Sequence, residues 1–235
     1  MGDEHDIDLR AEWVRLLAHD LRAPLTALTA SIGFLEQQHH DLDSAYLLSA
    51  ARDSLLRLSR IIDNVEVRGQ FLDRAKPAEE TVDVTALVRE AAAALHSSLA
   101  LREARLEVDV GSDPVVVTSD AEVLRIIIAN ALLNAIESSP LQGLVRVELR
   151  RDAQDVRLRV SDEGPSIPPD FAGQALDDHG QLELRRRSVR IGRGLTLIAV
   201  RLAADALGGR AVLEPAGTRG CRLIVTVPVM GEGEG

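Results

Sequence analysis

The chain has 235 residues, of which 46% are hydrophobic, so it can bury one large core or two ordinary ones. Its net charge of −10 and its aromatic content of only 2% argue against a surface that binds nucleic-acid phosphates or stacks on bases. The single cysteine, Cys221, excludes an internal disulfide, and no apolar run is long enough to cross a membrane. These features predict a cytoplasmic protein that neither binds nucleic acid nor inserts into a membrane.

The first predicted helix has an apolar stripe with steps of three or four residues, which is typical of one helix face. The stripe comprises Val14, Leu17, Leu21, Leu25 (or Pro24), Leu28, Ile32 and Leu35. His19 lies two positions from both Leu17 and Leu21, so at about 100° per residue it points away from the stripe toward solvent. Asp20 follows it, and Pro24 removes a helical hydrogen bond one turn later. An exposed imidazole beside a carboxylate is a candidate phosphoryl acceptor.

A polar stretch separates this helix from a second amphipathic helix, for which Asp43 or Ser44 is a candidate N-cap. The second stripe comprises Leu48, Ala51, Leu55, Leu58, Ile62 and Val65. Two such helices joined by a short turn form a hairpin in which each stripe is only half covered. Dimerisation into a four-helix bundle would bury the rest, so we predict a homodimer.

Residues 73–81 are charged and contain a proline, and they separate two different sequence patterns. We therefore predict a helical hairpin domain over residues 1–72, a linker over 73–81, and a second domain over 82–235. In the second domain the patterns predict helices around residues 84–103, 120–138 and 195–207. They predict strands around residues 105–110, 115–118, 145–150, 155–161, 211–214 and 222–227, with a poorly periodic stretch over 164–193. The second domain is thus predicted to be an α+β sandwich with helices on one face of a mixed sheet.

Two asparagines, Asn130 and Asn134, are four residues apart and share one face of the predicted 120–138 helix. Amide oxygens suit a hard cation such as Mg²⁺, although most paired helix asparagines are ordinary surface groups. Farther along, Asp162 ends a predicted strand and Gly164 follows it. A carboxylate in such a turn can accept a hydrogen bond from a purine amine, while glycine permits close backbone approach.

Gly192 and Gly194 precede the last predicted helix, where free backbone N–H groups and the helix dipole can hold phosphate.

Each of these motifs is weak alone, but their order and spacing along the chain are specific. An acceptor-like histidine on a hairpin, a linker, an Asn-x-x-x-Asn helix, an Asp-x-Gly turn and a Gly-x-Gly helix start together resemble the two-component sensor histidine kinases. The resemblance extends from about Ala11 to Pro228.

This resemblance implies a dimerising hairpin followed by an ATP-binding domain of the Bergerat, or GHKL, type. His19 would be autophosphorylated with Mg-ATP, with Asp20 as the adjacent acid, and the phosphoryl group would pass to an aspartate on a response regulator receiver domain. The stretch before Leu9 is too short for a sensor domain, so we expect the input to come from a separate sensor protein or control to come from the partner. The resemblance assigns ATP binding to Asn130, Asn134, Asp162, Gly164, Gly192 and Gly194, with Asn134 as the Mg²⁺ ligand.

The sequence departs from the family pattern at several positions. Glu137 stands where the family commonly has a lysine, and Ser166 where it usually has a glycine. The segment Gly217–Cys221 looks like a third glycine box, but Cys221 replaces a threonine that often helps adenine binding. These changes favour a second interpretation, a histidine phosphotransfer protein whose degenerate second domain binds no ATP. A third interpretation is a catalytically silent scaffold that binds receiver domains, although retention of His19 with its acidic neighbour argues against it.

Two further expectations follow from the resemblance. Residues 165–191 would form a mobile lid over the nucleotide, with Phe171 as its only aromatic residue. Ala23 stands four residues after His19, where family members that dephosphorylate their partners often carry threonine or asparagine. Alanine has no group that orients water, so the sequence predicts poor phosphatase activity.

Overall fold

The computed structural model describes residues 21–22, 24–32, 48, 51, 54–55, 58, 77–186 and 194–229. The chain divides into two compact units, Met1–Val65 and Glu66–Gly235. In the part of the chain that the structure describes, no helix combines the length and apolar character needed to cross a membrane.

The described residues of the first unit are helical, as their apolar periodicity predicts. They are residues 21–22, 24–32, 48, 51, 54–55 and 58. Four of the predicted stripe residues remain about half exposed within the single chain: Leu25, Ile32, Leu48 and Leu55. Apolar side chains left at this exposure are the surface that a second copy of a helical hairpin would cover.

The second unit alternates strands and helices along the chain. Its elements are β1 (Glu80–Asp83), α3 (Val84–Ala94), α4 (His96–Arg102), β2 (Arg105–Asp109), β3 (Val116–Ser119), α5 (Ala121–Ser138), β4 (Leu144–Arg151), β5 (Asp155–Ser161), the 3-10 helix η1 (Pro169–Phe171), α6 (Asp178–Arg186), α7 (Gly194–Ala206), β6 (Arg210–Pro215) and β7 (Cys221–Pro228). Asp83 and Asp120 cap α3 and α5, because each side chain accepts a hydrogen bond from a backbone N–H in the first turn.

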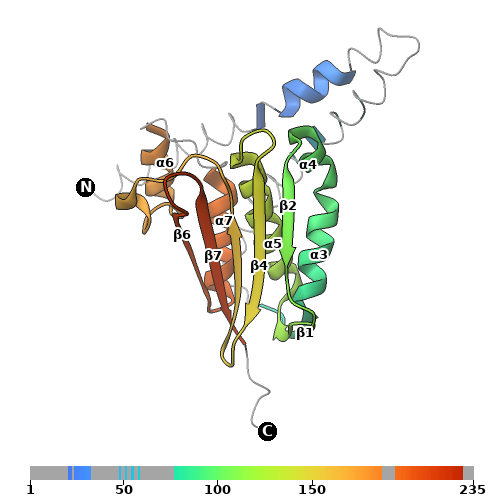
Figure 1. Cartoon of the computed structure of the whole chain (residues 1–235), viewed down its shortest axis with the longest axis vertical. Coiled ribbons are helices and arrows are strands. Elements are labelled where there is room, and N and C mark those ends of the chain that lie inside the picture. The colour runs from blue at the N-terminus through green and yellow to red at the C-terminus, as the bar shows by residue number, and fades with distance from the viewer. Residues whose placement is uncertain are drawn as a thin grey trace. The chain divides into compact units, whose positions relative to one another are not determined.

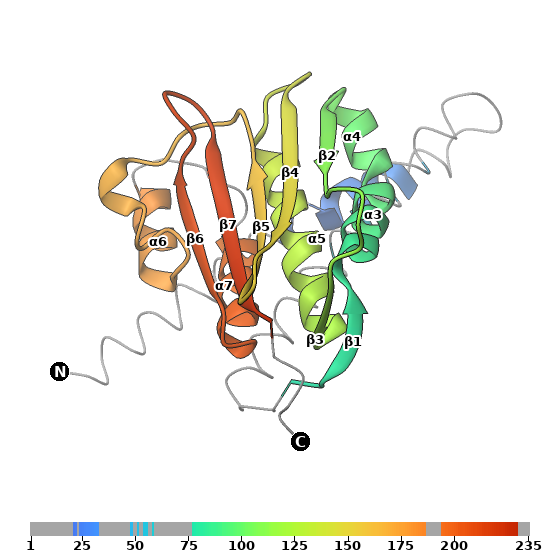
Figure 2. The same cartoon turned by 60° about the horizontal axis from the view of Figure 1, so that its bottom comes forward.

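The main sheet has five strands in the order β2-β4-β5-β7-β6. β2 and β4 are parallel, and the other neighbours are antiparallel, so the sheet is mixed. β1 and β3 form a separate antiparallel pair. Helices α3, α5 and α7 lie on one face of the main sheet (Figures 1 and 2). This two-layer arrangement confirms the predicted α+β fold.

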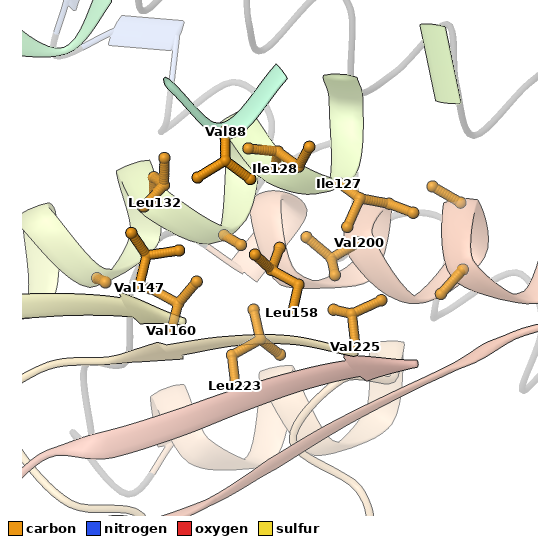
Figure 3. Close-up of a cluster of buried hydrophobic side chains, with 14 of the residues drawn as sticks. Val88, Ile127, Ile128, Leu132, Val147, Leu158, Val160, Val200, Leu223 and Val225 are labelled. Atoms are coloured by element: carbon orange, nitrogen blue, oxygen red, sulfur yellow. The ribbon is translucent and has the colours of Figure 1, made fainter. Parts of the chain in front are cut away.

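The core lies between this helical layer and the sheet (Figure 3). Side chains of α5 and α7, such as Ile127 and Val200, face inward-pointing strand residues such as Leu158 and Val225. In β5 the buried residues alternate with more exposed ones, which is the period of a strand with one covered face. The core is almost entirely aliphatic, as the low aromatic content predicts.

The structure differs from the predicted elements in three places. The helix predicted over residues 84–103 is divided at Leu95, which is 1% exposed and leaves the helical conformation so that its side chain enters the core. β1 begins at Glu80, within the predicted linker, and its pairing with β3 gives no local sequence signal. The poorly periodic stretch contains η1 and α6, whose many charged residues obscure any apolar stripe.

Candidate functional site

Asp162 directly follows β5, and its side chain is 7% exposed. Its Oδ1 accepts hydrogen bonds from the backbone N–H groups of Gly164 at 2.8 Å and Cys221 at 3.3 Å. Burial raises the pKa of Asp162 to about 6, and these two hydrogen bonds oppose the shift. Among the described residues, Oδ2 has no hydrogen-bond partner. This second oxygen is therefore left to accept from a ligand.

Two glycines shape the turn around Asp162. A Cβ on Gly164 would clash with the carbonyl oxygen of Ser138, at the end of α5, so only glycine fits there. A Cβ on Gly220 would clash with the carbonyl oxygen of Asp162, and Gly220 also has a φ of +79°. The Gly220 N–H donates to the Gly164 carbonyl at 2.7 Å. The two turns, far apart in sequence, thus lie directly against each other.

The two asparagines on α5 are buried, with exposures of 5% for Asn130 and 2% for Asn134. Among the described residues, Asn134 Oδ1 has no hydrogen-bond partner. An unpaired buried polar atom costs about 1–3 kcal/mol, so its presence is a reason to look for a polar ligand. Because this atom is a hard oxygen donor, it fits a Mg²⁺ ion bound together with water and phosphate oxygens. No cluster of three or more histidine, cysteine or acidic side chains within the described ranges forms an alternative metal site.

The end of α5 is fixed against its surroundings by Arg102 of α4. The Arg102 guanidinium donates to the carbonyl oxygens of Glu137 and Ser139, at 2.9 Å each. Glu137 lies in the last turn of α5 and Ser139 is its C-cap residue, so neither carbonyl has a helical partner. The positive charge of Arg102 also complements the helix dipole. On the other side of the turn, Glu163 Oε2 accepts from the Leu144 N–H at 3.0 Å.

The predicted site residues are placed by the structure to different extents. Asp162 and Gly164 lie together beside the end of α5, and Asn130 and Asn134 lie on that same helix. Gly194 is the first residue of α7. The remaining predicted site residues, His19, Asp20 and Gly192, and also Ala23, lie outside the described residues.

The structure also describes the positions at which the sequence departs from the family pattern. Cys221 is 1% exposed, and its Sγ donates to the Pro165 carbonyl at 3.4 Å. Burial, with a smaller effect from the nearby Asp162 charge, raises the pKa of the Cys221 thiol to about 12. Glu137 and Ser166 are each half-buried.

Phe171, expected in the lid, is 5% exposed and belongs to the hydrophobic core. It therefore packs inside the domain.

Sequence reasoning did not single out two residues that shape this site, Ser138 and Arg102. The contact between Ser138 and Gly164 has no local sequence signal, because it joins a helix end to a turn two strands later. Arg102 carries a weak signal, since it is a basic residue in the last turn of a helix. Its bonds to the end of α5 nevertheless depend on tertiary packing.

Comparison with known proteins places both units in characterised families. Residues 119–231 match the family described as histidine kinase-, DNA gyrase B- and HSP90-like ATPase. Residues 9–70 match the family described as His Kinase A (phospho-acceptor) domain. Together the two matches extend over most of the chain.

Relatives with similar sequences are named adaptive-response sensory kinase SasA. The protein from Synechocystis sp. (strain ATCC 27184 / PCC 6803 / Kazusa) is 28% identical over 204 residues, which are 81% of this chain and 52% of that protein. The protein from Synechococcus sp. (strain JA-3-3Ab) is 29% identical over 230 residues, 95% of this chain and 60% of that protein. The chain thus spans between half and two thirds of the length of these curated relatives.

Solved structures show the same fold. Acinetobacter baumannii histidine kinase AdeS matches 90% of this chain and 98% of its own with a TM-score of 0.61 and 20% identity. Full-length ShkA, solved in complex with AMPPNP, matches 92% of this chain and 45% of its own with a TM-score of 0.63 and 21% identity.

Proposed function

Because the chain belongs to the two-component sensor histidine kinases, we propose that it autophosphorylates His19 with Mg-ATP and passes the phosphoryl group to an aspartate of a response regulator. The observation that carries this proposal is the environment of Asp162. Its carboxylate is buried, held by two backbone N–H groups through one oxygen, and left with a second oxygen for a ligand. Such an acceptor suits the exocyclic amine of adenine.

The remaining ATP contacts come from α5 and the start of α7. Asn134 would bind Mg²⁺ through Oδ1, with Asn130 on the same helix beside the phosphates. Gly192 and Gly194 would let the phosphates approach backbone N–H groups at the positive end of the α7 dipole. When bound, Mg²⁺ supplies charge neutralisation for the phosphate oxygens.

His19 is the proposed nucleophile. The ordinary pKa of histidine, about 6.5, leaves much of the imidazole neutral at cellular pH. One ring nitrogen would form a bond to the γ-phosphorus as the bond to the ADP oxygen breaks, and Asp20 would take the proton from the other ring nitrogen. The phosphohistidine would then donate its phosphoryl group to the carboxylate of a receiver domain. We further propose that the protein acts as a cytoplasmic homodimer.

A second candidate function is that of a histidine phosphotransfer protein that binds no ATP. The burial of Cys221 favours it, because the thiol donates to the Pro165 carbonyl and supplies no hydroxyl for adenine. Glu137 favours it as well, since a carboxylate in place of a lysine would repel a triphosphate. The retained Asp162 turn argues for the kinase.

One experiment separates these functions. The purified full chain is incubated with Mg²⁺ and ATP labelled at the γ-phosphate, together with His19→Gln and Asn134→Ala variants and the matched control His96→Gln, which alters an exposed histidine of α4. Acid-labile label that disappears in the first two variants and persists in the control supports the kinase. Label acquired only from a phosphorylated receiver domain supports phosphotransfer, and no label by either route supports a silent scaffold.

A further inference from the structure

One face of the main sheet is opposite α3, α5 and α7 (Figure 2). The strand register places several charged side chains on this face. Four of its arginines each form an ion pair with a carboxylate on a neighbouring strand. The pairs are Arg146–Glu107 at 2.7 Å, Arg159–Glu148 at 3.1 Å, Arg222–Glu214 at 3.1 Å, and Arg150–Asp109. Pairs this exposed contribute little stability, but each cancels the charge of its arginine.

Arg157 and Arg210 differ from these four. Both are exposed, and neither forms an ion pair with any described residue. The strand register places Arg157 of β5 and Arg210 of β6 on opposite sides of Thr226 in β7. Two strand spacings separate their backbones by about 10 Å. The sheet therefore presents in one row two positive charges that form no ion pair with a described residue, on a chain whose net charge is −10. Two backbone hydrogen bonds lower the pKa of Asp152, and the charge of Arg157 adds a smaller effect, so Asp152 balances Arg157 in part.

The next row of the same face contains Arg159, which is paired with Glu148, and then two apolar residues. Val212 pairs with Ile224 in the register of β6 and β7, and Val212 is 41% exposed while Ile224 is half-buried. These two side chains and the two unpaired arginines line one hollow of about 320 Å³. We call this hollow the Arg157–Arg210 groove. It combines exposed apolar surface with two positive charges that have no ion-pair partner among the described residues, so a partner with carboxylates and apolar side chains would complement it.

We propose that the Arg157–Arg210 groove binds an extended acidic segment of a partner protein, in which acidic and apolar residues alternate. Successive side chains of an extended segment point to opposite sides. Carboxylates on one side therefore reach the two arginines, while apolar side chains on the other cover Val212 and Ile224. The net negative charge of the chain disfavours such a segment over much of the surface, and this groove brings two cations together beside apolar side chains.

Other polyanions fit the groove less well. A nucleic-acid backbone needs a longer run of cations and offers nothing to cover the two apolar residues. An anionic lipid surface is flat and attracts protruding basic residues, whereas these two arginines border a hollow that also contains Glu214. The inference does not depend on the ATP site, because the groove lies on the other face of the sheet from α5 and α7.

The test measures binding of a fluorescein-labelled hexapeptide of alternating glutamate and leucine to the full chain by fluorescence anisotropy. Arg157→Gln and Arg210→Gln each remove one positive charge from the groove. Arg89→Gln is the matched control, because Arg89 is an exposed arginine on α3 with no ion pair among the described residues. Val212→Ser removes apolar contact without changing charge.

We expect each groove arginine variant to weaken peptide binding about twofold to fivefold, which is the range of an exposed ion pair. In the double variant, peptide binding should be weakened by the product of the two single-variant factors. Val212→Ser should also bind the peptide more weakly, and Arg89→Gln should bind it as the parent does. A peptide with glutamine in place of glutamate should bind more weakly. Equal loss in Arg89→Gln, or no loss in any groove variant, would overturn the proposal.

Vesicles containing phosphatidylserine provide the remaining comparison. If the chain binds these vesicles through Arg157 and Arg210 but does not bind the peptide, the groove is a lipid site and the proposal is wrong. The groove variants should bind ATP as the parent does. Failure of the peptide experiment is thereby separated from failure of the kinase proposal, which is judged by label on His19.

Discussion

The backbone of Gly164 lies directly against the carbonyl oxygen of Ser138, with no room for a side chain between them. This contact joins the turn after β5 to the last turn of α5, and so links the proposed adenine acceptor to the helix that carries the proposed Mg²⁺ ligand. The geometry of the ATP site therefore depends on a glycine that contributes no functional group.

Replacing Gly164 with alanine should separate the Asp162 turn from α5. Overpacking of this kind typically costs about 1–3 kcal/mol, and the displaced carboxylate should also bind ATP more weakly. Urea denaturation measures the first effect and equilibrium dialysis with ATP the second. Gly173→Ala is the matched control, since a Cβ there meets nothing within 4 Å. Equal stability of the two variants would contradict the close contact.

Asp162→Asn should make the free energy of unfolding less dependent on pH. The pKa of Asp162 is about 6 in the folded protein against an ordinary value of 3.8, so the folded state binds the proton more tightly than the unfolded state. Stability from this group is fully present below about pH 4 and is lost as the pH rises through about 6. The loss is on the order of 2–3 kcal/mol.

Urea unfolding of the parent and Asp162→Asn at pH 4.5 and pH 7.5 measures this difference. The variant should be the more stable protein at pH 7.5, yet it should bind ATP at least about tenfold more weakly, because an amide N–H₂ would face the adenine amine. Asp113→Asn, on an exposed loop, serves as the control. An identical pH dependence in parent and Asp162→Asn would show that the carboxylate is not buried.

Asn134→Leu should leave stability unchanged or raise it by about 1 kcal/mol. The buried Oδ1 has no partner among the described residues, and an apolar side chain of similar size removes an unsatisfied acceptor. The same variant should lose Mg-dependent autophosphorylation. Calorimetric melting and γ-phosphate labelling check the two expectations. A loss of stability well above 2 kcal/mol would show that Asn134 Oδ1 already has a structural partner.

Cys221 should resist alkylation in the folded protein. With a thiol pKa of about 12, the thiolate fraction at pH 8 is on the order of one in ten thousand, and the residue is also buried. Mass spectrometry after iodoacetamide treatment should find unmodified protein under native conditions and one adduct in urea. Rapid native labelling would mean that the Asp162 turn opens readily.

Much of the second unit could be predicted because its signals are local. The alternation in Val156, Leu158 and Val160 predicts β5, and aliphatic periodicity with a capping Asp120 predicts α5. Asp162 and Gly164 were recognisable as a turn after a strand. These residues carry their structural preferences within a few positions along the chain.

The properties that adapt the site to ATP are not local. One of the two hydrogen bonds that oppose the raised pKa of Asp162 comes from Cys221 at the start of β7. The clash that requires glycine at position 164 depends on the end of α5. Phe171 lies in the segment for which the resemblance implies a lid, and its burial in the core depends on tertiary packing. Contacts between distant segments decide each of these cases.

The bonds of Gly220 and Cys221 to the Asp162 turn have a consequence for biosynthesis. β7 leaves the ribosome after every other strand of its sheet, yet it sits between β5 and β6 and supplies one of the two backbone donors to Asp162. A nascent chain therefore cannot complete the hydrogen bonds of the Asp162 turn until translation has passed the start of β7. Premature termination before that point would therefore leave the proposed adenine acceptor without one of its two backbone donors.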